Sequence, residues 1–140
     1  MRIVLDTNVL VAGLISPFGP PAQILRLLTA GKLSICYDAR ILTEYSDVLK
    51  RPKFSFNADA VEGLLDYLIQ NGEAIAAIPL AASLPDADDD AFLEIALSGK
   101  ADALITGNLI HFPKQFCGDI SVVSPADFLI FYKEKTSGSA

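Results

Sequence analysis

The sequence has few of the side chains that build a zinc site. It contains a single histidine, His111, and only two cysteines, Cys36 and Cys117, which lie far apart in the chain. No Cys/His ligand set can be assembled from these residues. Because a free cysteine behaves as a small hydrophobic residue, we expect both to be ordinary core or surface residues of a reduced, cytoplasmic protein.

The chain also lacks a long uninterrupted apolar run. A membrane span needs roughly 18–20 such residues, and no run approaches this length. The apolar start, MRIVLDTNVLVAGL, is interrupted by Asp6, Thr7 and Asn8. It has neither the basic segment nor the small-residue cleavage site of a signal peptide. We therefore expect no signal peptide and no membrane partner.

Basic residues are fewer than acidic ones. The chain has 11 Lys and Arg against 17 Asp and Glu, which gives a net charge of −6. A generic nucleic-acid-binding protein normally presents a basic face, so the charge argues against that class unless the acids are concentrated in one place. The length of 140 residues suits one domain. We predict a single domain over residues 1–134 and a frayed tail over 135–140.

Short apolar runs alternate with segments of helical pattern. The predicted strands are 3–5, 33–37, 74–80, 101–106 and 119–123. The predicted helices are 9–15, 22–31, 39–51, 57–72, 86–99 and 124–134. Strands that alternate with helices form a parallel sheet covered on both faces. The prediction is a three-layer α/β/α fold with a central parallel sheet of about five strands.

Acidic residues gather at one edge of this predicted sheet. Asp6 follows the first strand directly, and Asn108 comes just after the fourth. Ligands bind at the carboxyl ends of parallel strands, and the connecting helices begin at the same edge. The segment LPDADDDAFLEIA opens such a helix. Its acidic residues ahead of the apolar run are Asp86, Asp88, Asp89 and Asp90.

Glu44 belongs to the same group. On a helical wheel of ILTEYSDVL it falls at the edge of the apolar stripe, beside Ile41 and Val48. A carboxylate there is partly desolvated unless a cation meets it. A structural partner, Arg40, lies one turn earlier, so a plain ion pair is the alternative interpretation of Glu44.

The aspartate cluster exceeds what helix capping requires. One aspartate can cap a helix, and each further acid near the N-terminus adds about 0.3–1 kcal/mol at most, while neighbouring carboxylates repel one another. Unpaired carboxylates with no histidine or cysteine nearby suit hard cations, so we expect Mg²⁺ or Mn²⁺. Two such ions about 3.5–4 Å apart are the usual clamp for phosphodiester hydrolysis.

Several of these segments together resemble a known family. They are RIVLDTNVLVAGL, Glu44 in ILTEYSDVL, PDADDDAFLEIALSGKADALITGN, the HFP at 111–113 and SPADFL near the end. In this order and over nearly the whole chain, the sequence resembles PIN-domain nucleases, and among them the VapC-like toxin components of toxin–antitoxin pairs. The resemblance implies a PIN fold, an acidic site for Mg²⁺ or Mn²⁺ and hydrolysis of RNA.

The resemblance also implies roles for individual residues. The implied catalytic acids are Asp6, Glu44 and Asp90. The implied metal ligands are Asp6, Glu44, Asp90, Asp89 and Asn108. The implied supporting residues are Thr7, Asn8, Asp86, Asp88 and Thr106. Candidate substrate contacts are Lys50, Arg51 and His111, although Lys50 and Arg51 also suit the C-terminal dipole of a helix and His111 also suits a structural hydrogen bond.

One departure from the family pattern leaves an alternative open. Asn108 stands where many PIN domains have a further aspartate. Its carbonyl can ligate Mg²⁺ but brings no charge. The alternative function is therefore a catalytically weak or inactive PIN-like module that binds RNA or protein.

The resemblance further implies a small antitoxin partner that covers the acidic groove, often with an arginine, and a possible homodimer. Apolar residues of the last predicted helix are candidates for the dimer contact or for the core. They are Phe128, Leu129, Phe131 and Tyr132.

Two other small α/β classes are excluded by single positions. A phosphoacceptor receiver domain needs an aspartate after its third strand, where this chain has IPLAASLP, and a lysine after its fifth. A phosphohydrolase of the haloacid-dehalogenase type needs a second aspartate two residues after the first, where this chain has Asn8.

Overall fold

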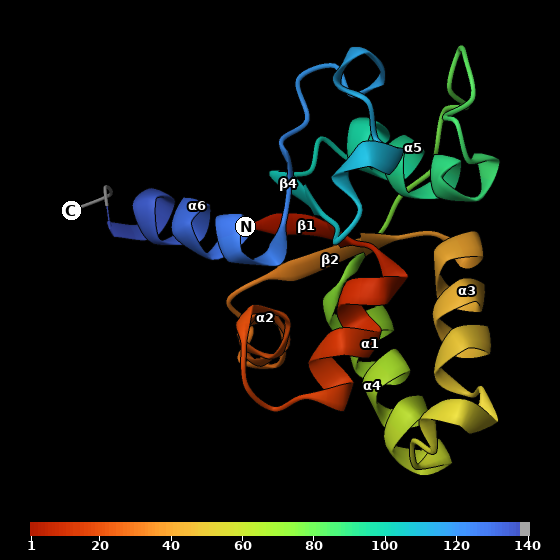
Figure 1. Ribbon diagram of the computed structural model, residues 1–140, viewed down its shortest axis with the longest axis vertical. Coiled ribbons are helices and arrows are strands. Elements are labelled where there is room, and N and C mark those ends of the chain that lie inside the picture. Colours follow the sequence, from red (N-terminus) through yellow and green to blue (C-terminus); the bar gives the residue numbers. More distant parts are fainter. Residues whose placement is uncertain (138–140) are drawn as a thin grey trace.

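The computed structural model describes residues 1–137, and its centre is a five-stranded parallel sheet (Figure 1). The strands are β1 (Arg2–Leu5), β2 (Ser34–Tyr37), β3 (Glu73–Ala74), β4 (Ala103–Ile105) and β5 (Val122–Val123), in the order β3-β2-β1-β4-β5. Ile3 of β1 lies opposite Ile35 of β2 and Ala103 of β4. The predicted parallel sheet is confirmed.

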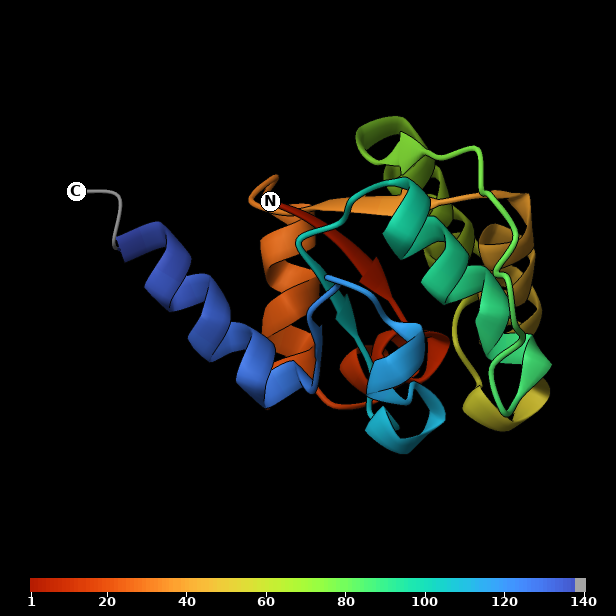
Figure 2. The same ribbon diagram turned by 90° about the horizontal axis from the view of Figure 1, so that it is seen from above.

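Helices cover both faces of the sheet. They are α1 (Thr7–Ile15), α2 (Pro20–Thr29), α3 (Ala39–Leu49), α4 (Ala58–Asn71), α5 (Asp90–Ser98) and α6 (Pro125–Ser137). In Figure 1, α5 lies above the strands, while α1, α2 and α4 lie below them. This is the predicted three-layer α/β/α arrangement. Seen from above, α6 extends outward beside α2 (Figure 2), and Phe128 is its one fully buried residue among those described.

The central strands are buried on both faces. Ile3, Val4 and Leu5 of β1 have no exposed surface, and the same holds for all of β4. Because both faces of such strands are buried, their sequences are continuous apolar runs. The largest fully buried side chains, Tyr45 and Phe92, pack against each other with ring centroids 6.5 Å apart. They bring α3 and α5 together.

The third strand is much shorter than predicted. The apolar segment 74–80 was expected to be a strand ending at Pro79, but β3 ends at Ala74 and residues 75–80 are irregular. The reason lies in its neighbour. Ala74 pairs with Tyr37, the last residue of β2, and Asp38 then caps α3 by accepting a hydrogen bond from the Ile41 amide at 3.1 Å. An edge strand cannot continue beyond the strand that pairs with it.

Most helices differ from the prediction at one or both ends, and three differences are the most informative. The second helix begins at Pro20 instead of residue 22 and ends at Thr29 instead of residue 31, with both Pro20 and Pro21 in its first turn. The aspartate cluster first forms a 3₁₀ turn, Ala87–Asp89, and α5 begins at Asp90. The last helix continues to Ser137, so residues 135–137 are helical and not part of a frayed tail, while 138–140 lie outside the described residues.

None of the helices within residues 1–137 is by itself long and apolar enough to cross a bilayer. The pair α1 and α2 reaches that length and composition only jointly, with a 97° bend between the two helices.

Candidate functional site

Asp6 stands at the carboxyl end of β1 and is almost completely buried, with 5% of its surface exposed. Its backbone amide donates to the Ile105 carbonyl at 2.9 Å, and its Oδ2 accepts the Thr106 hydroxyl at 2.7 Å. Thr106 Oγ1 in turn accepts the Asn108 amide at 3.0 Å. Burial raises the pKa of Asp6, against the lowering effect of the Thr106 hydrogen bond. The ends of β1 and β4 therefore hold this carboxylate in one position.

Glu44 reaches the same edge from α3. Its Oε2 accepts the hydroxyl of Thr7, the first residue of α1. The pKa of Glu44 is raised, first by burial and then by the charges of Asp6 and Asp88, whereas Arg51 lowers it. The like-charge effect of Asp6 shows that the two carboxylates share one region.

The structural alternative for Glu44, an ion pair with Arg40, is wrong. Arg40 Nε binds Asp38 Oδ2 at 2.8 Å, and its Nη1 binds Glu94 Oε1 at 2.7 Å. Glu44 thus keeps a desolvated carboxylate that its own helix does not neutralise.

Asp89 is the third acid of the group. Its side chain is 13% exposed, and burial together with the charges of Asp6 and Asp86 raises its pKa to about 6. His111 opposes this rise. Oδ2 of Asp89 is a fully buried oxygen that accepts no well-directed hydrogen bond from the described residues. Such an oxygen is costly to bury unless a cation or another donor meets it.

His111 lies beside Asp89. It ends the 3₁₀ turn Leu109–His111 that follows β4, and its Nδ1 is 3.1 Å from Asp89 Oδ2. Ligand atoms of Asp86, Asp89 and His111 all lie within 4.8 Å of one another. The expectation that no histidine lies near the acids is therefore wrong. The signal that could have found this contact is the position of His111 a few residues after the fourth predicted strand, but the sequence does not give its distance from the cluster.

Asp90 has partners of its own. Its Oδ2 accepts the Ser83 hydroxyl at 2.7 Å, and its Oδ1 accepts the Leu84 amide at 2.8 Å. The carboxylate predicted to be catalytic thus holds the segment that leads into the aspartate cluster.

A sequence signal distinguishes Asp89 from its neighbour Asp90. Asp89 continues the buried stripe of α5, because Phe92, Leu93 and Ala96 follow it at helical spacings of three, four and seven residues.

Glu94 is a buried charge that sequence reasoning did not assign to any role. It is 7% exposed and accepts hydrogen bonds from Arg40 and, at 3.0 Å, from the Leu80 amide. Glu94 therefore ties α5 both to the start of α3 and to the irregular segment after β3. The signal was an acid inside an otherwise apolar helical run.

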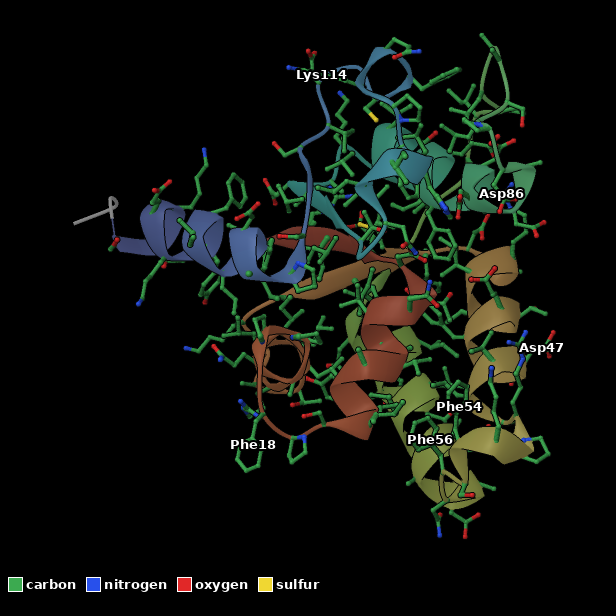
Figure 3. All side chains as sticks on the ribbon, in the orientation of Figure 1. Phe18, Asp47, Phe54, Phe56, Asp86 and Lys114 are labelled. Atoms are coloured by element: carbon green, nitrogen blue, oxygen red, sulfur yellow. The ribbon has the colours of Figure 1, made fainter. Side chains whose placement is uncertain are left out.

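The remaining predicted residues are exposed, and Lys50 lies away from the acids. Asn8 and Asp88 are exposed, and the Asp88 amide donates to Asp86 Oδ1 at 3.0 Å. Lys50 pairs with Glu62 on α4, at the end of α3 farthest from the aspartates. Figure 3 shows Asp86 beside the start of α3, while Asp47 lies further along that helix. Arg51 follows α3 and is exposed.

The donor set fits a divalent cation. The ligand atoms that lie within 4.8 Å of one another are those of Asp86, Asp89 and His111, and Asp6 and Glu44 add carboxylates at the same edge of the sheet. Oδ2 of Asp89 is buried and accepts no well-directed hydrogen bond from the described residues. Burial raises the pKa of Asp6, Glu44 and Asp89, and like charges raise it further on Glu44 and Asp89, as expected of a site that binds a cation.

A family model described as "PIN domain" matches residues 2–109. The chain belongs to the PIN-domain family, whose members are typically nucleases.

Two solved structures are similar in fold. One is VapBC2 from Rickettsia felis bound to a DNA fragment from their promoter, with 17% identity and a TM-score of 0.56. The other is FitAcB from Neisseria gonorrhoeae, with 18% identity and a TM-score of 0.56. Each match covers 89% of this chain and 98% of the matched chain. A comparison with curated proteins finds no match.

Proposed function

We propose that this protein is a divalent-metal-dependent endoribonuclease. The observation that carries the proposal is the meeting of Asp6, Glu44 and Asp89 from three separate elements at the carboxyl edge of the sheet, each with its pKa raised by burial. Structural acids are normally paired with bases. No Lys or Arg among the described residues forms an ion pair with any of these three, and only His111 lies beside Asp89. Such an arrangement destabilises a fold and favours cation binding.

The residues of the site have different proposed roles. Thr106 fixes Asp6 and Thr7 fixes Glu44, so both carboxylates are held before an ion arrives. Asp6, Glu44 and Asp89 are the proposed ligands, with Asp86 adjoining. A bound Mg²⁺ or Mn²⁺ would supply a Lewis acid that activates water and neutralises charge on the phosphate. Asn108 donates its backbone amide to Thr106 Oγ1, which in turn donates to Asp6.

Asp89 replaces Asp90 in this proposal as the third acid. Both oxygens of Asp90 already accept hydrogen bonds from Ser83 and Leu84. The catalytic role of Asp90 stays a prediction, and its contacts favour a role in shaping the segment before α5.

RNA is the proposed substrate, and a toxin–antitoxin pair is the proposed setting. The first rests on the resemblance to VapC-like PIN nucleases, with Arg51 near Glu44 as the candidate phosphate contact. The second adds the fold shared with VapBC2 and FitAcB. A small antitoxin that places an arginine among the acids would neutralise the charge that a metal otherwise meets. The proposal includes a cytoplasmic protein able to form a homodimer.

Incubation of tag-free protein with structured and single-stranded RNAs tests the proposal. Cleavage should require Mg²⁺ or Mn²⁺, stop with EDTA, and be lost in Asp6→Asn and Asp89→Asn. Asp47→Asn is the matched control, because Asp47 is an exposed acid elsewhere on α3. Cleavage that survives in Asp6→Asn would refute the assigned site. Metal binding without cleavage of any RNA would favour the alternative, a PIN-like binding module.

A further inference from the structure

His111 is placed where a metal ligand would be, and no other residue of the chain can substitute for it, because it is the sole histidine. Its Nδ1 lies 3.1 Å from Asp89 Oδ2. Two neighbouring ligands of an octahedral ion, each about 2.1 Å from the metal, lie about 3 Å apart. The nitrogen and the oxygen therefore already have the spacing of adjacent ligands.

The two atoms lie at ion-pair distance, and His111 lowers the pKa of Asp89, but their geometry is not that of a well-directed hydrogen bond. Asp89 Oδ2 is buried and accepts no well-directed donor from the described residues, although Nδ1 is close. A histidine that only held Asp89 in place would point an N–H at the oxygen. Asp86 completes the group, with ligand atoms of all three residues within 4.8 Å of one another.

We propose that His111 is a direct ligand of the ion held by Asp89, and that the site consequently prefers a first-row transition cation such as Mn²⁺ or Co²⁺ to Mg²⁺. An all-oxygen site suits Mg²⁺, whereas an imidazole nitrogen adds affinity that rises along the first-row series. The inference rests on the divalent-ion site of the proposed function and adds the chemical class of the ion.

An ion-pair role and a ligand role for His111 predict different effects on metal binding. An imidazolium bound to Asp89 would compete with any incoming cation, so its removal would tighten the binding of every divalent ion. A ligand behaves in the opposite way, because its removal weakens binding and weakens it most for the ions that favour nitrogen. The two roles therefore predict opposite signs for one measurement.

Calorimetric titration of the full, tag-free chain with Mg²⁺, Mn²⁺ and Co²⁺ makes this measurement. Wild type should bind Mn²⁺ and Co²⁺ more tightly than Mg²⁺. His111→Ala should lose about 10-fold or more in affinity for Co²⁺ and Mn²⁺, with a smaller loss for Mg²⁺. Equal losses for all three ions, or tighter binding, would overturn the proposal. His111→Gln is a second variant that keeps the size and polarity of the side chain, in case His111→Ala folds poorly.

A spectroscopic readout tests coordination without any activity. Pulsed electron paramagnetic resonance of the Mn²⁺-loaded protein should show ¹⁴N coupling from an imidazole, which can only come from His111. The coupling should vanish in His111→Gln and persist in Asp47→Asn. If wild type binds Mn²⁺ but shows no ¹⁴N coupling, the proposal that His111 is a ligand is refuted, and the nuclease proposal is unaffected. Failure of RNA cleavage with the coupling present would do the reverse.

Discussion

Asp89 and Asp90 are adjacent in the sequence, yet their carboxylates have different partners. The Asp89 carboxylate lies beside His111, and its pKa is raised by the charges of Asp6 and Asp86. The Asp90 carboxylate instead accepts hydrogen bonds from Ser83 and Leu84. One residue along a helix turns the side chain by about 100°. One carboxylate therefore faces the acidic site, and the other closes the segment that precedes α5.

This difference predicts opposite effects of two similar substitutions. Asp89→Asn should lower RNA cleavage by about 100-fold or more without loss of stability in EDTA, because it removes a buried charge among like charges. Asp90→Asn should reduce the free energy of unfolding by about 1–3 kcal/mol, since it weakens two hydrogen bonds to a charged acceptor, and should keep much of the cleavage. Cleavage assays and urea unfolding measure both. Full activity in Asp89→Asn together with inactive, stable Asp90→Asn would restore Asp90 as the catalytic acid.

In the absence of metal ions, the free energy of unfolding should depend on pH because of the raised pKa of Asp89. The pKa of this acid rises from 3.8 to about 6 in the folded chain, so between these values the folded state binds more protons than the unfolded state. Protonated Asp89 therefore stabilises the folded state relative to ionised Asp89. This stabilisation is present at low pH and is lost as pH rises through about 6. The free energy of unfolding of wild type, minus that of Asp89→Asn, should therefore fall between pH 4 and pH 7 in EDTA. A flat difference would contradict the raised pKa.

Metal binding should depend on pH in the complementary direction. A carboxylate must lose its proton before it binds a cation, so the affinity for Mn²⁺ should increase as pH rises from about 5 to 7. Titration calorimetry at several pH values, with buffers of different ionisation enthalpy, should detect protons released on binding. Binding that is independent of pH and releases no proton would show that Asp89 is already ionised and that its pKa is not raised.

The ion pair between half-exposed Arg40 and buried Glu94 should contribute more to stability than an exposed pair. Glu94→Ala should cost about 2–4 kcal/mol of unfolding free energy, because it leaves Arg40 and the Leu80 amide without this acceptor. The exposed pair of Lys50 and Glu62 is the matched control, and Lys50→Met should cost less than about 1 kcal/mol. Chemical denaturation of both variants makes the comparison. Similar losses in the two variants would show that burial of Glu94 adds nothing.

Alanine substitutions of two glycines, Gly63 inside α4 and Gly72 directly after it, should change stability in opposite directions. A Cβ at Gly72 would lie 2.5 Å from the Leu68 carbonyl and 2.6 Å from the Ile35 carbonyl, so Gly72→Ala should destabilise by about 1–3 kcal/mol. A Cβ at Gly63 meets nothing within 4 Å inside the helix, so Gly63→Ala should stabilise by about 0.5–1 kcal/mol. Thermal unfolding of both variants tests the pair. A stabilising Gly72→Ala would mean that β2 and the end of α4 separate easily.

The sequence by itself determined the order of elements and the edge at which the acids meet. Continuous apolar runs predicted β1, β2 and β4 because strands covered on both faces need no alternation, and the helical pattern from residue 39 onward predicted α3. Asp6 and Asn108 fell at the correct edge because parallel strands place their carboxyl ends together. All of these are short-range properties that a sequence carries in its pattern.

Tertiary structure alone decided the partners. β3 stopped at Ala74 because β2 ended, which the apolar pattern of 75–80 does not reveal. Arg40 met Glu94 instead of Glu44, and His111 came within 3.1 Å of Asp89, through contacts 54 and 22 residues apart along the chain. Which of several equivalent charges meet depends on the path of the loops and the rotation of each helix, and these are fixed by packing of the whole core, not by any local segment.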